Sequence, residues 1–428
     1  MRKKTIEQIH AGDICGKNIY SYSRNNDNEI IPELLVARGI RLTEAIIHRL
    51  HERQIFELYV EEPGTEDVKE AEELVPSRVR LKLMNNLSRE MKLIDQKILE
   101  QFHTQSLDYV AESLVEDKKY TAIIDKIEFD RKLFRSMAQQ LFDSVLKQKK
   151  EIIPNLYLIQ THDDYTFRHS IDVAIFAIWI SRLINWVTKA TLEDVIIGCL
   201  LHDVGKRFIP KEILNYPGKL PESHMKYIHA HPSIGYELIR AQGFSHMSAH
   251  VAFQHHERQD GQGYPQGLMG FNRIHRPRYT PLGYILLIAE ITAVADTMDA
   301  MSSNRTYRHR LPHDIAVRNL QYAISPEKKQ LNYEIVKEVL RFYPSYPAGE
   351  NIEIYHPLSH PLFKAQGIVL ENQFPSIERP RIRLLYNADG KRLREPIDIS
   401  LVENEDVMIR CTDYLDDRLK SIFYAGQG

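Results

Sequence analysis

The segment DVIIGCLLHDVGK, residues 194–206, decides how this chain folds. Residues 194–201 are almost entirely apolar, which predicts a buried helix. The polar pair His202-Asp203 follows directly at the end of this run, and Val204-Gly205-Lys206 comes next. A His-Asp pair alone is weak evidence, because many chains of this length contain one by chance. Its meaning therefore depends on the residues around it.

Further residues of metal-ligating types stand on both sides of this pair. In chain order they are His169, His231, His255, His256 and Asp296. Imidazole nitrogen suits iron and zinc, and carboxylate oxygen suits manganese, so this mixed set fits any of the three. The sequence thus offers a candidate metal site built from several helix-patterned segments.

Five histidines and two aspartates are more ligands than a single ion needs. Two ions about 3.5–4 Å apart, sharing one carboxylate and one hydroxide, would use all of them. Such a pair lowers the pKa of the shared water and stabilises the charge that builds on a phosphate during in-line attack. Asp203, directly after His202, is the natural bridging ligand.

Each residue also has an ordinary structural explanation. His169 on an apolar helix face could be a core histidine, and His231 before Pro232 could mark a helix break, because proline disfavours helix at the preceding residue. Asp296 stands in an otherwise apolar helix, where an unpaired charge is costly, and so it needs a partner. Taken jointly, these explanations leave several buried polar residues without a purpose, and we favour the metal centre.

A loop is expected directly after the paired histidines. Gly261, Gly263 and Pro265 favour a tight turn over a helix. Beside a metal pair, such a loop is a suitable place for a lid or for contact with a substrate base. The alternative is an ordinary surface loop, which explains the glycines but not their position.

The motifs HDVGK, HHERQDGQGYP and ADTMDAMSSNRTYR stand in this order, and residues 160–325 resemble the HD-GYP subgroup of the HD metal-dependent phosphohydrolases. The resemblance implies an all-helical domain that holds two divalent ions, iron, manganese or zinc, and hydrolyses the bacterial signalling molecule cyclic di-GMP. It implies metal ligation by His169, His202, Asp203, His231, His255, His256 and Asp296.

The resemblance also implies roles for residues around the metals. Lys206 is expected to act near the scissile phosphate, as a charge clamp or a proton donor. Arg305 and Arg308 match positions that contact ligand phosphates, which guanidinium groups bind in a bidentate manner. The substrate-contacting signature of the subgroup is the tripeptide Gly263-Tyr264-Pro265.

Two features depart from the subgroup pattern. Some relatives carry a glutamate four residues before the first histidine, where it helps to bind a third metal. Here this position is Tyr165, so we expect two metals, which is compatible with a reaction that stops at linear pGpG and leaves onward hydrolysis to GMP open. The arginine-rich segment 271–281 is longer than usual, and a solvated insertion is favoured over added contacts to an anionic ligand.

The whole chain is predicted to be mainly α, with the phosphohydrolase domain at 151–345. A small α+β unit at 1–62, a candidate for sensing or dimerisation, precedes it, and a small β-rich domain follows at 346–428. Strands are expected at 33–37, 56–60, 365–370, 380–385 and 406–410, and a helix at 43–53.

The charged segment 63–150 is expected to be a helical linker. Near its end, apolar residues recur at helical spacing, at Leu133, Phe134, Met137, Leu141, Val145 and Leu146. A packed helix that joins domains is the favoured interpretation. The alternative is a dimer-forming helix, which would make the protein a homodimer.

Composition excludes several other classes of protein. A formal net charge of −2 gives no electrostatic case for binding long nucleic acid. The 3 cysteines lie far apart and predict neither a disulfide framework nor a thiolate zinc site. No apolar run approaches the about 20 residues of a membrane span, and no signal peptide is expected. We therefore expect a cytoplasmic protein.

Three functions compete at this point. The leading hypothesis is a phosphodiesterase that hydrolyses cyclic di-GMP through attack by metal-bound hydroxide. The second is an HD hydrolase acting on another nucleotide, since a fold does not fix a substrate. The third is a non-catalytic cyclic di-GMP receptor, which is less favoured because every expected ligand position and Lys206 are filled.

Overall fold

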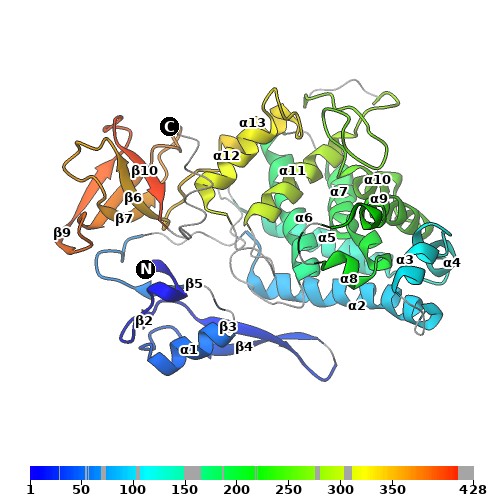
Figure 1. Cartoon of the computed structure of the whole chain (residues 1–428), viewed down its shortest axis with the longest axis horizontal. Coiled ribbons are helices and arrows are strands. Elements are labelled where there is room, and N and C mark those ends of the chain that lie inside the picture. The colour runs from blue at the N-terminus through cyan, green and yellow to red at the C-terminus, as the bar shows by residue number, and fades with distance from the viewer. Residues whose placement is uncertain are drawn as a thin grey trace.

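The computed structural model describes residues 1–27, 29–53, 55, 57–68, 74–102, 107–148, 165–185, 188–216, 218, 220–274, 280–302 and 311–412. Within these ranges a large helical body lies beside two smaller parts that contain the β-strands (Figure 1). The architecture is mainly α with several sheets, and the body holds all of the predicted metal ligands.

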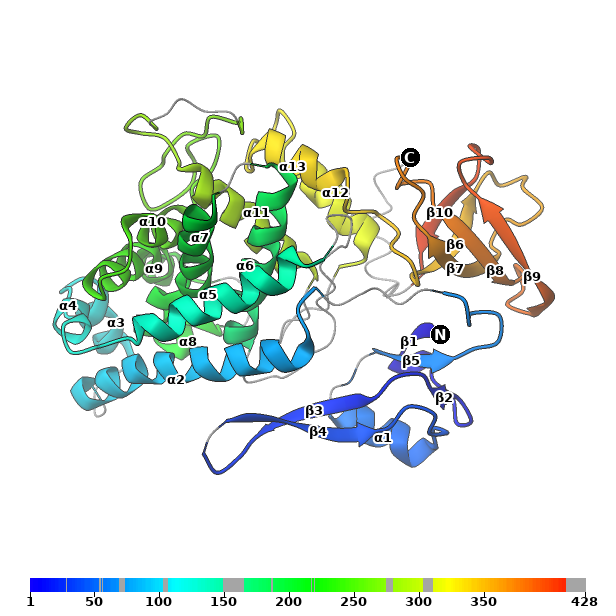
Figure 2. The same ribbon diagram turned by 180° about the vertical axis from the view of Figure 1, so that it is seen from behind.

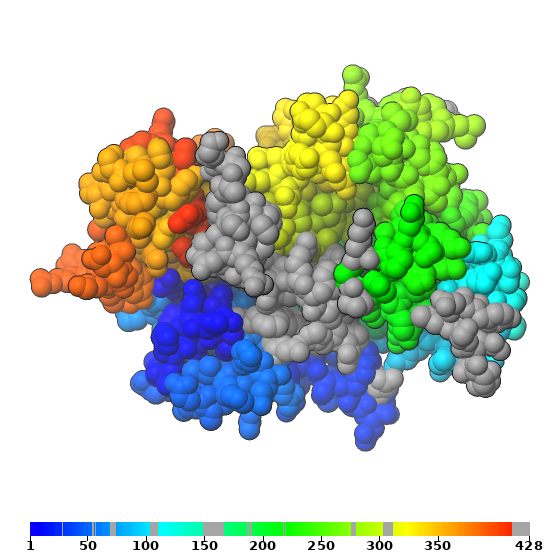
Figure 3. Space-filling view, viewed as in Figure 1, coloured from blue at the N-terminus to red at the C-terminus, as the bar shows by residue number. Residues whose placement is uncertain are grey.

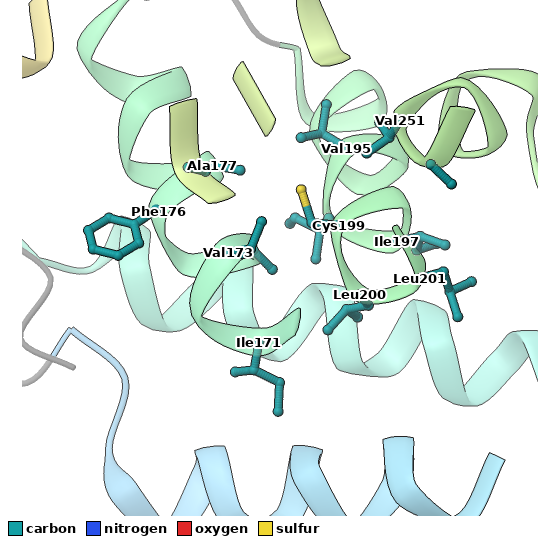
Figure 4. Packing of buried hydrophobic residues seen from close by; sticks show 14 of the residues in the cluster. Ile171, Val173, Phe176, Ala177, Val195, Ile197, Cys199, Leu200, Leu201 and Val251 are labelled. Atoms are coloured by element: carbon teal, nitrogen blue, oxygen red, sulfur yellow. The ribbon is translucent and has the colours of Figure 1, made fainter. Parts of the chain in front are cut away.

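Three helices that are apolar on nearly every side form the centre of the body. They are α6 (Tyr165–Leu183), α7 (Lys189–Leu201) and α11 (Leu287–Ser302). A helix without a polar face must be covered all round, and α6 packs against both α7 and α11. Figure 4 shows side chains of this core, among them Val173 of α6 and Leu200 of α7, both buried. Among the described residues no helix combines the length and hydrophobicity of a bilayer-spanning segment.

A second layer of helices covers α7. Here α10 (His246–Gln254) packs against α7 and against α9 (Glu222–Ala241), and the 3-10 helix η2 (Val204–Phe208) packs against α9. The remaining helices of this region are α8 (Lys211–Leu214), α12 (His313–Ala323) and α13 (Tyr333–Leu340). The predicted helix at 194–201 is the second half of α7, which begins earlier because Thr188 caps it, accepting a hydrogen bond from the Thr191 amide at 3.2 Å.

The helix α2 (Ser77–Phe102) runs along the body and contacts both α6 and η2 (Figure 2). With α3 (Leu107–Val115), α4 (Tyr120–Ile124) and α5 (Arg131–Leu146), it contributes side chains to the same hydrophobic core as α6 and α7. In α5 the buried residues are Phe134, Met137, Ala138, Leu141 and Val145. The apolar spacing near residue 140 thus marks a packed helix, as the favoured interpretation requires.

The N-terminal part has a small core of its own. Strands β1 (Arg2–Thr5), β5 (Glu57–Glu61) and β2 (Ile14–Cys15) form one sheet, in that order, and η1 (Ile6–Gln8) and α1 (Glu44–Glu52) pack with it. Strands β3 (Ile19–Arg24) and β4 (Ile30–Val36) pair as an antiparallel hairpin that contacts α2. The sequence predicted α1, β4 and β5 near these positions but missed β1, β2 and β3, which are short or polar.

The C-terminal part is an antiparallel sheet with the strand order β10-β6-β7-β8-β9. Its strands are β6 (Asn351–His356), β7 (Gln366–Glu371), β8 (Arg381–Tyr386), β9 (Arg392–Ser400) and β10 (Met408–Cys411). The sequence predicted β7, β8 and β10. It missed β9 because this edge strand is exposed along most of its length and lacks the apolar alternation of a half-buried strand.

The N-terminal and C-terminal parts contact each other directly. Lys3 Nζ lies 3.1 Å from Glu350 Oε2 in a buried ion pair, and Asn351 Nδ2 donates to Lys3 O at 2.6 Å. Arg383 Nη1 extends the contact to Asp67 at 2.6 Å. Figure 3 shows the two parts, blue and orange, next to each other at one end of the molecule. The two ends of the described chain therefore form one joint region beside the helical body.

Candidate metal centre

The residues predicted as metal ligands converge at one place in the helical body. His169 lies in α6, His202 and Asp203 at the junction of α7 and η2, His231 in α9, His255 and His256 directly after α10, and Asp296 in α11. His169, His202, Asp203, His231 and His255 are all at most 6% exposed. These side chains form a buried polar cluster inside an otherwise apolar core.

Asp203 stands at the centre of the cluster, and its two oxygens face different imidazoles. Oδ2 lies 3.7 Å from His169 Nε2 and 3.6 Å from His202 Nε2. Oδ1 lies 3.4 Å from His231 Nε2 and 3.7 Å from His255 Nε2. Two groups of ligand atoms can each hold an ion, His169 with His202 and Asp203, and Asp203 with His231, His255 and His256. Among the described residues Asp203 alone belongs to both groups, as expected of a bridging ligand.

Four of the imidazoles are oriented by a hydrogen bond at Nδ1, on the side away from Asp203. His202, His231 and His255 pair with the backbone carbonyls of Cys199, Ile228 and Ala252 at 2.8, 2.6 and 2.8 Å. His169 pairs with Asp299 Oδ2 at 2.6 Å. When Nδ1 carries the proton, Nε2 keeps its lone pair and points toward the centre, which is the tautomer a metal ligand needs.

Pro232 explains how His231 obtains its carbonyl partner. The helix α9 continues through Pro232, which excludes the alternative explanation that His231 marks a helix break. Proline has no amide hydrogen, so the carbonyl four residues earlier, that of Ile228, loses its helical donor. His231 Nδ1 takes up this carbonyl at 2.6 Å. The His-Pro dipeptide therefore builds a ligand orientation into the helix itself.

Burial and neighbouring charges set the protonation of the cluster. Burial lowers the pKa of His202 and of His231 to about 4, so both imidazoles are neutral near pH 7. Although burial opposes ionisation of Asp203, the Lys206 ammonium and the imidazoles hold its pKa well below the usual value. Burial also works against protonation of His169, but the carboxylates of Asp299, Asp296 and Asp203 together outweigh it and raise the pKa. The neutral imidazoles of His202 and His231 and the ionised carboxylate of Asp203 are in the states that bind a cation.

Unsatisfied atoms provide a further test of whether a metal fits. Within the described part of the chain, His202 Nε2 and Asp203 Oδ1 are buried and make no hydrogen bond. Buried polar atoms without partners are costly, and a role in binding an ion is one of the ordinary reasons for them. Both atoms belong to the same cluster of nitrogen and oxygen donors, and so the residues present fit a divalent metal.

Lys206 and Asp296 lie on the accessible side of the cluster. Asp296 Oδ1 is 3.3 Å from His169 Nε2, and its side chain is 21% exposed. Lys206 Nζ is 2.6 Å from Asp203 Oδ2, and its side chain is 31% exposed. The other side chains around Asp203 Oδ2 are buried, so a substrate would approach past Lys206 and Asp296.

Gly205 allows η2 to approach α9 closely enough for Asp203 to meet His231. A Cβ at this position would lie 2.0 Å from His231 O and 2.9 Å from Gly235 N. We expect Gly205→Ala to lower the free energy of unfolding by about 1–3 kcal/mol, the usual cost of overpacking, and to weaken metal binding. Denaturant unfolding and metal titration check this result.

Gly235→Ala is the matched control, because Gly235 lies on the α9 side of the same close contact between η2 and α9. Its Cβ would meet no atom closer than 3.5 Å, and we expect no loss of stability, because alanine is favoured over glycine inside a helix by about 1 kcal/mol. Equal stability and metal affinity of the two variants would contradict the close-approach argument.

The loop after the paired histidines lies against the cluster. Tyr264 N donates to His256 O at 3.2 Å, and Glu257 accepts from the amides of Gln266 and Leu268 at 2.7 and 2.8 Å. These bonds fold residues 257–268 back onto the end of α10. Tyr264 is thereby held beside the metal cluster, while its contact with a substrate stays a prediction.

The sequence analysis missed one residue of the site, Asp299. Two residues that it predicted, Arg305 and Arg308, lie outside the described part of the chain. Asp299 was not assigned a role, although it follows Asp296 by one helical turn in a buried helix and so shares its face. The phosphate contacts of Arg305 and Arg308 stay a prediction. In the segment 271–281, Ile274 is buried and its amide donates to Glu334 at 2.6 Å, whereas Asn272 and Arg273 are exposed. Residues 275–279 lie outside the described residues, so the solvated insertion stays a prediction.

A comparison with protein families agrees with this geometry. The family model described as HD domain matches residues 166–301, which include His169, the His202-Asp203 pair and Asp296. Residues 166–301 form an HD domain. The matched range covers the central helices α6, α7 and α11 almost completely, so the HD domain is the core of the helical body.

Curated relatives also match this region. A cyclic di-GMP phosphodiesterase of Pseudomonas aeruginosa is 28% identical over 256 residues, 60% of this chain and 56% of the relative. A cyclic di-GMP phosphodiesterase response regulator of Xanthomonas campestris is 43% identical over 119 residues, 27% of this chain and 28% of the relative. A 3'3'-cGAMP-specific phosphodiesterase of Vibrio cholerae is 29% identical over 234 residues, 52% of this chain and 48% of the relative. The chain thus spans about half or less of the length of these relatives.

Proposed function

We propose that this protein is a metal-dependent phosphodiesterase that hydrolyses cyclic di-GMP to pGpG, with GMP as a further product to be tested. The observation that carries the proposal is Asp203, whose two oxygens face two separate groups of imidazoles. Relatives named as cyclic di-GMP phosphodiesterases support the substrate class. A relative named for 3'3'-cGAMP makes that dinucleotide the second substrate to test.

Each residue of the centre has a definite part in this proposal. Two divalent ions, when bound, would lower the pKa of a water and neutralise charge on the phosphate. His169, His202, Asp203 and Asp296 would hold one ion, and Asp203, His231, His255 and His256 the other. Nδ1 hydrogen bonds keep four of the five imidazoles in place, those of His169, His202, His231 and His255, so this part of the site is organised before substrate arrives.

Lys206 is proposed to serve the leaving group. Its ammonium stands on the accessible side of Asp203 at 2.6 Å, where it can attract a phosphate and give a proton to the departing ribose oxygen. Asp296 lies on the same side and limits how the anionic substrate can enter, because its carboxylate repels a phosphate unless a cation lies between them.

Product analysis tests the proposal. Purified protein is loaded with Mn²⁺, or anaerobically with Fe²⁺, and incubated with cyclic di-GMP or 3'3'-cGAMP, and products are separated by ion-exchange chromatography. Formation of pGpG with either metal is the expected result. Tight binding of cyclic di-GMP without turnover by either loaded form would favour a receptor instead, and the absence of both would point to other nucleotides.

Lys206→Met is expected to lower kcat by about 10²-fold, the range for loss of a proton donor, while two metals per chain remain bound. Methionine keeps an unbranched side chain, one atom shorter than that of lysine, and removes its charge and its hydrogen-bond donors. Lys211→Met, in the next helix α8, is the matched control and should leave kcat unchanged. Loss of metal together with kcat would assign Lys206 to the support of Asp203 rather than to the leaving group.

We also propose the division of the chain into residues 1–62, 63–150, 151–345 and 346–428. Separate hydrophobic cores in the N-terminal and C-terminal parts support the outer boundaries. The described helices α2 and α5 of the segment 63–150 share a core with α6, which supports a linker that packs onto the HD domain. A cytoplasmic location and a homodimer stay predictions, which fractionation of cells and light scattering would test.

A further inference from the structure

His256 differs from the other imidazoles of the centre in how it is held. Each of the other histidines has a hydrogen-bond partner at Nδ1. Among the described residues, no hydrogen bond to the His256 ring is present, although this ring belongs to the group that can hold the second ion. A ligand without such a bond needs another source of orientation, because a rotating imidazole binds a metal weakly.

Stacked rings surround His256 instead. The Tyr264 ring stacks on it with centroids 4.7 Å apart and planes inclined by 28°. The His229 ring also stacks on the Tyr264 ring, with centroids 4.0 Å apart and planes inclined by 22°. The rings of His231 and His255 complete the surroundings, at 5.0 and 4.0 Å from His256. We call His229, Tyr264 and His256 the ring column.

The backbone fixes Tyr264 within the ring column. Its amide donates to His256 O at 3.2 Å, which places the two residues side by side. Gly263 makes this approach possible, since a Cβ there would lie 2.4 Å from Glu257 Cα and 2.6 Å from His256 O. Glu257 then anchors the rest of the loop through the amides of Gln266 and Leu268. Tyr264 therefore has little freedom to leave His256.

We propose that Tyr264 is a positioning residue for the second metal ion, which it serves by holding the His256 ring through stacking, with His229 closing the ring column from outside. The ring of Tyr264, rather than its hydroxyl, carries this role, since stacking uses the face of the ring. The inference rests on the metal binding proposed above. It gives the Gly-Tyr-Pro loop a structural role, the orientation of a metal ligand.

Metal titration of the apo protein tests the proposal without any measurement of turnover. Mn²⁺ is added to chelator-treated protein, and calorimetry gives the number of ions and the affinity of each. We expect Tyr264→Leu to keep one tight ion and to weaken the other by about 10- to 100-fold, as loss of a supporting partner usually does. Tyr264→Phe should bind both ions as the unaltered protein does, and His229→Ala should give a smaller loss than Tyr264→Leu.

Two comparisons separate positioning from general damage. Tyr284→Leu removes a similar stacked pair, with Phe271 at 4.4 Å, away from any predicted ligand, and should bind both ions normally. The double variant His256→Ala with Tyr264→Leu should bind Mn²⁺ no more weakly than His256→Ala alone, because the two residues act on one ligand.

Several outcomes would overturn the proposal. Two tight ions in Tyr264→Leu, additive losses in the double variant, or a Tyr264→Phe variant as weak as Tyr264→Leu would each exclude positioning by the ring. If the unaltered protein bound no Mn²⁺ at all, the metal centre itself would be refuted, which is a different result from intact binding in the variants.

Discussion

Asp203→Ala is expected to remove both metal ions and to lower the rate of cyclic di-GMP hydrolysis by about 10³-fold or more. The reason is that, among the described residues, only Asp203 contributes to both groups of ligand atoms. Without it, His231 and His255 lose the carboxylate oxygen at 3.4 and 3.7 Å. A loss of only about 4 kcal/mol of transition-state stabilisation already lowers a rate 10³-fold.

Asp203→Asn distinguishes charge from shape in the same position. The amide has nearly the volume of the carboxylate, but it cannot offer an anionic oxygen to each side. We therefore expect Asp203→Asn to fail almost as completely as Asp203→Ala, both in elemental analysis for bound metal and in product formation. Two bound ions in either variant would contradict the bridging role.

Glu193→Ala is the matched control for these variants. Glu193 is an acidic residue of α7, the helix that precedes Asp203, but it is partly exposed and pairs with Arg135, 3.5 Å away. Removal of an exposed pair costs about 0–1 kcal/mol. This variant should keep both ions and full turnover, so a general loss in all three variants would point to damaged folding.

Arg80→Met is expected to have the largest effect on stability. Arg80 of α2 is hydrogen-bonded to Asp172 of α6, and their side chains are 4% and 0% exposed. Burial raises the pKa of Asp172 to about 6, even though Arg80 opposes this shift. Breaking a buried ion pair from one side costs about 3–5 kcal/mol, because the remaining charge has no sufficient partner.

Arg168 moderates this cost but does not remove it. Its Nε lies 3.9 Å from Asp172 Oδ2, too far for a hydrogen bond. We therefore expect a loss near the lower end, about 3 kcal/mol, measured by denaturant unfolding of the apo protein. The double variant Arg80→Met with Asp172→Leu should recover most of it, since replacing both charges with apolar groups is often neutral.

Arg89→Met in the same helix provides the control for Arg80. The Arg89 side chain is 63% exposed and lies 3.7 Å from Glu90, and its removal should change the free energy of unfolding by less than about 1 kcal/mol. Equal losses in Arg80→Met and Arg89→Met would mean that helix propensity, and not the buried pair, explains the result. A double variant no better than Arg80→Met would equally contradict the ion-pair argument.

The stability of this pair matters for the metal centre because Asp172 and His169 lie one turn apart on α6. His169 is oriented by Asp299, whose charge also acts on Asp172. Arg80 thus supplies positive charge to Asp172, a buried carboxylate behind the first ligand on which a second buried carboxylate, Asp299, also acts. We infer that α2, through Arg80, stabilises this buried negative charge within the helical body.

Much of the metal cluster could be predicted from the sequence because its signals are local. The apolar run before His202-Asp203 predicted a buried helix, and α7 ends there as expected. The carbonyl partners of His202, His231 and His255 each lie three residues earlier on the same helix. Helical geometry alone brings such atoms together, and so these orientations follow from the sequence once the helices are known.

Other features depended on how distant helices pack. Asp299 reaches His169 across 130 positions, and Arg80 reaches Asp172 across 92. The ring column likewise joins His229 of α9 to Tyr264 in the loop. Hydrophobic periodicity indicates which face of a helix is buried. It does not indicate which residue of another helix contacts that face, because the pairing depends on crossing angles and axial offsets.

The sequence by itself therefore determined that the chain is mainly α, that residues 194–206 end a buried helix in a His-Asp pair, and that the other histidines and Asp296 are candidates for one centre. Only the tertiary structure decided which imidazoles share each oxygen of Asp203, that α2 carries a buried counter-charge, and that His256 is held by rings rather than by a hydrogen bond. The physical reason is that local geometry fixes contacts within a helix, whereas contacts between helices arise from the close packing of the whole core.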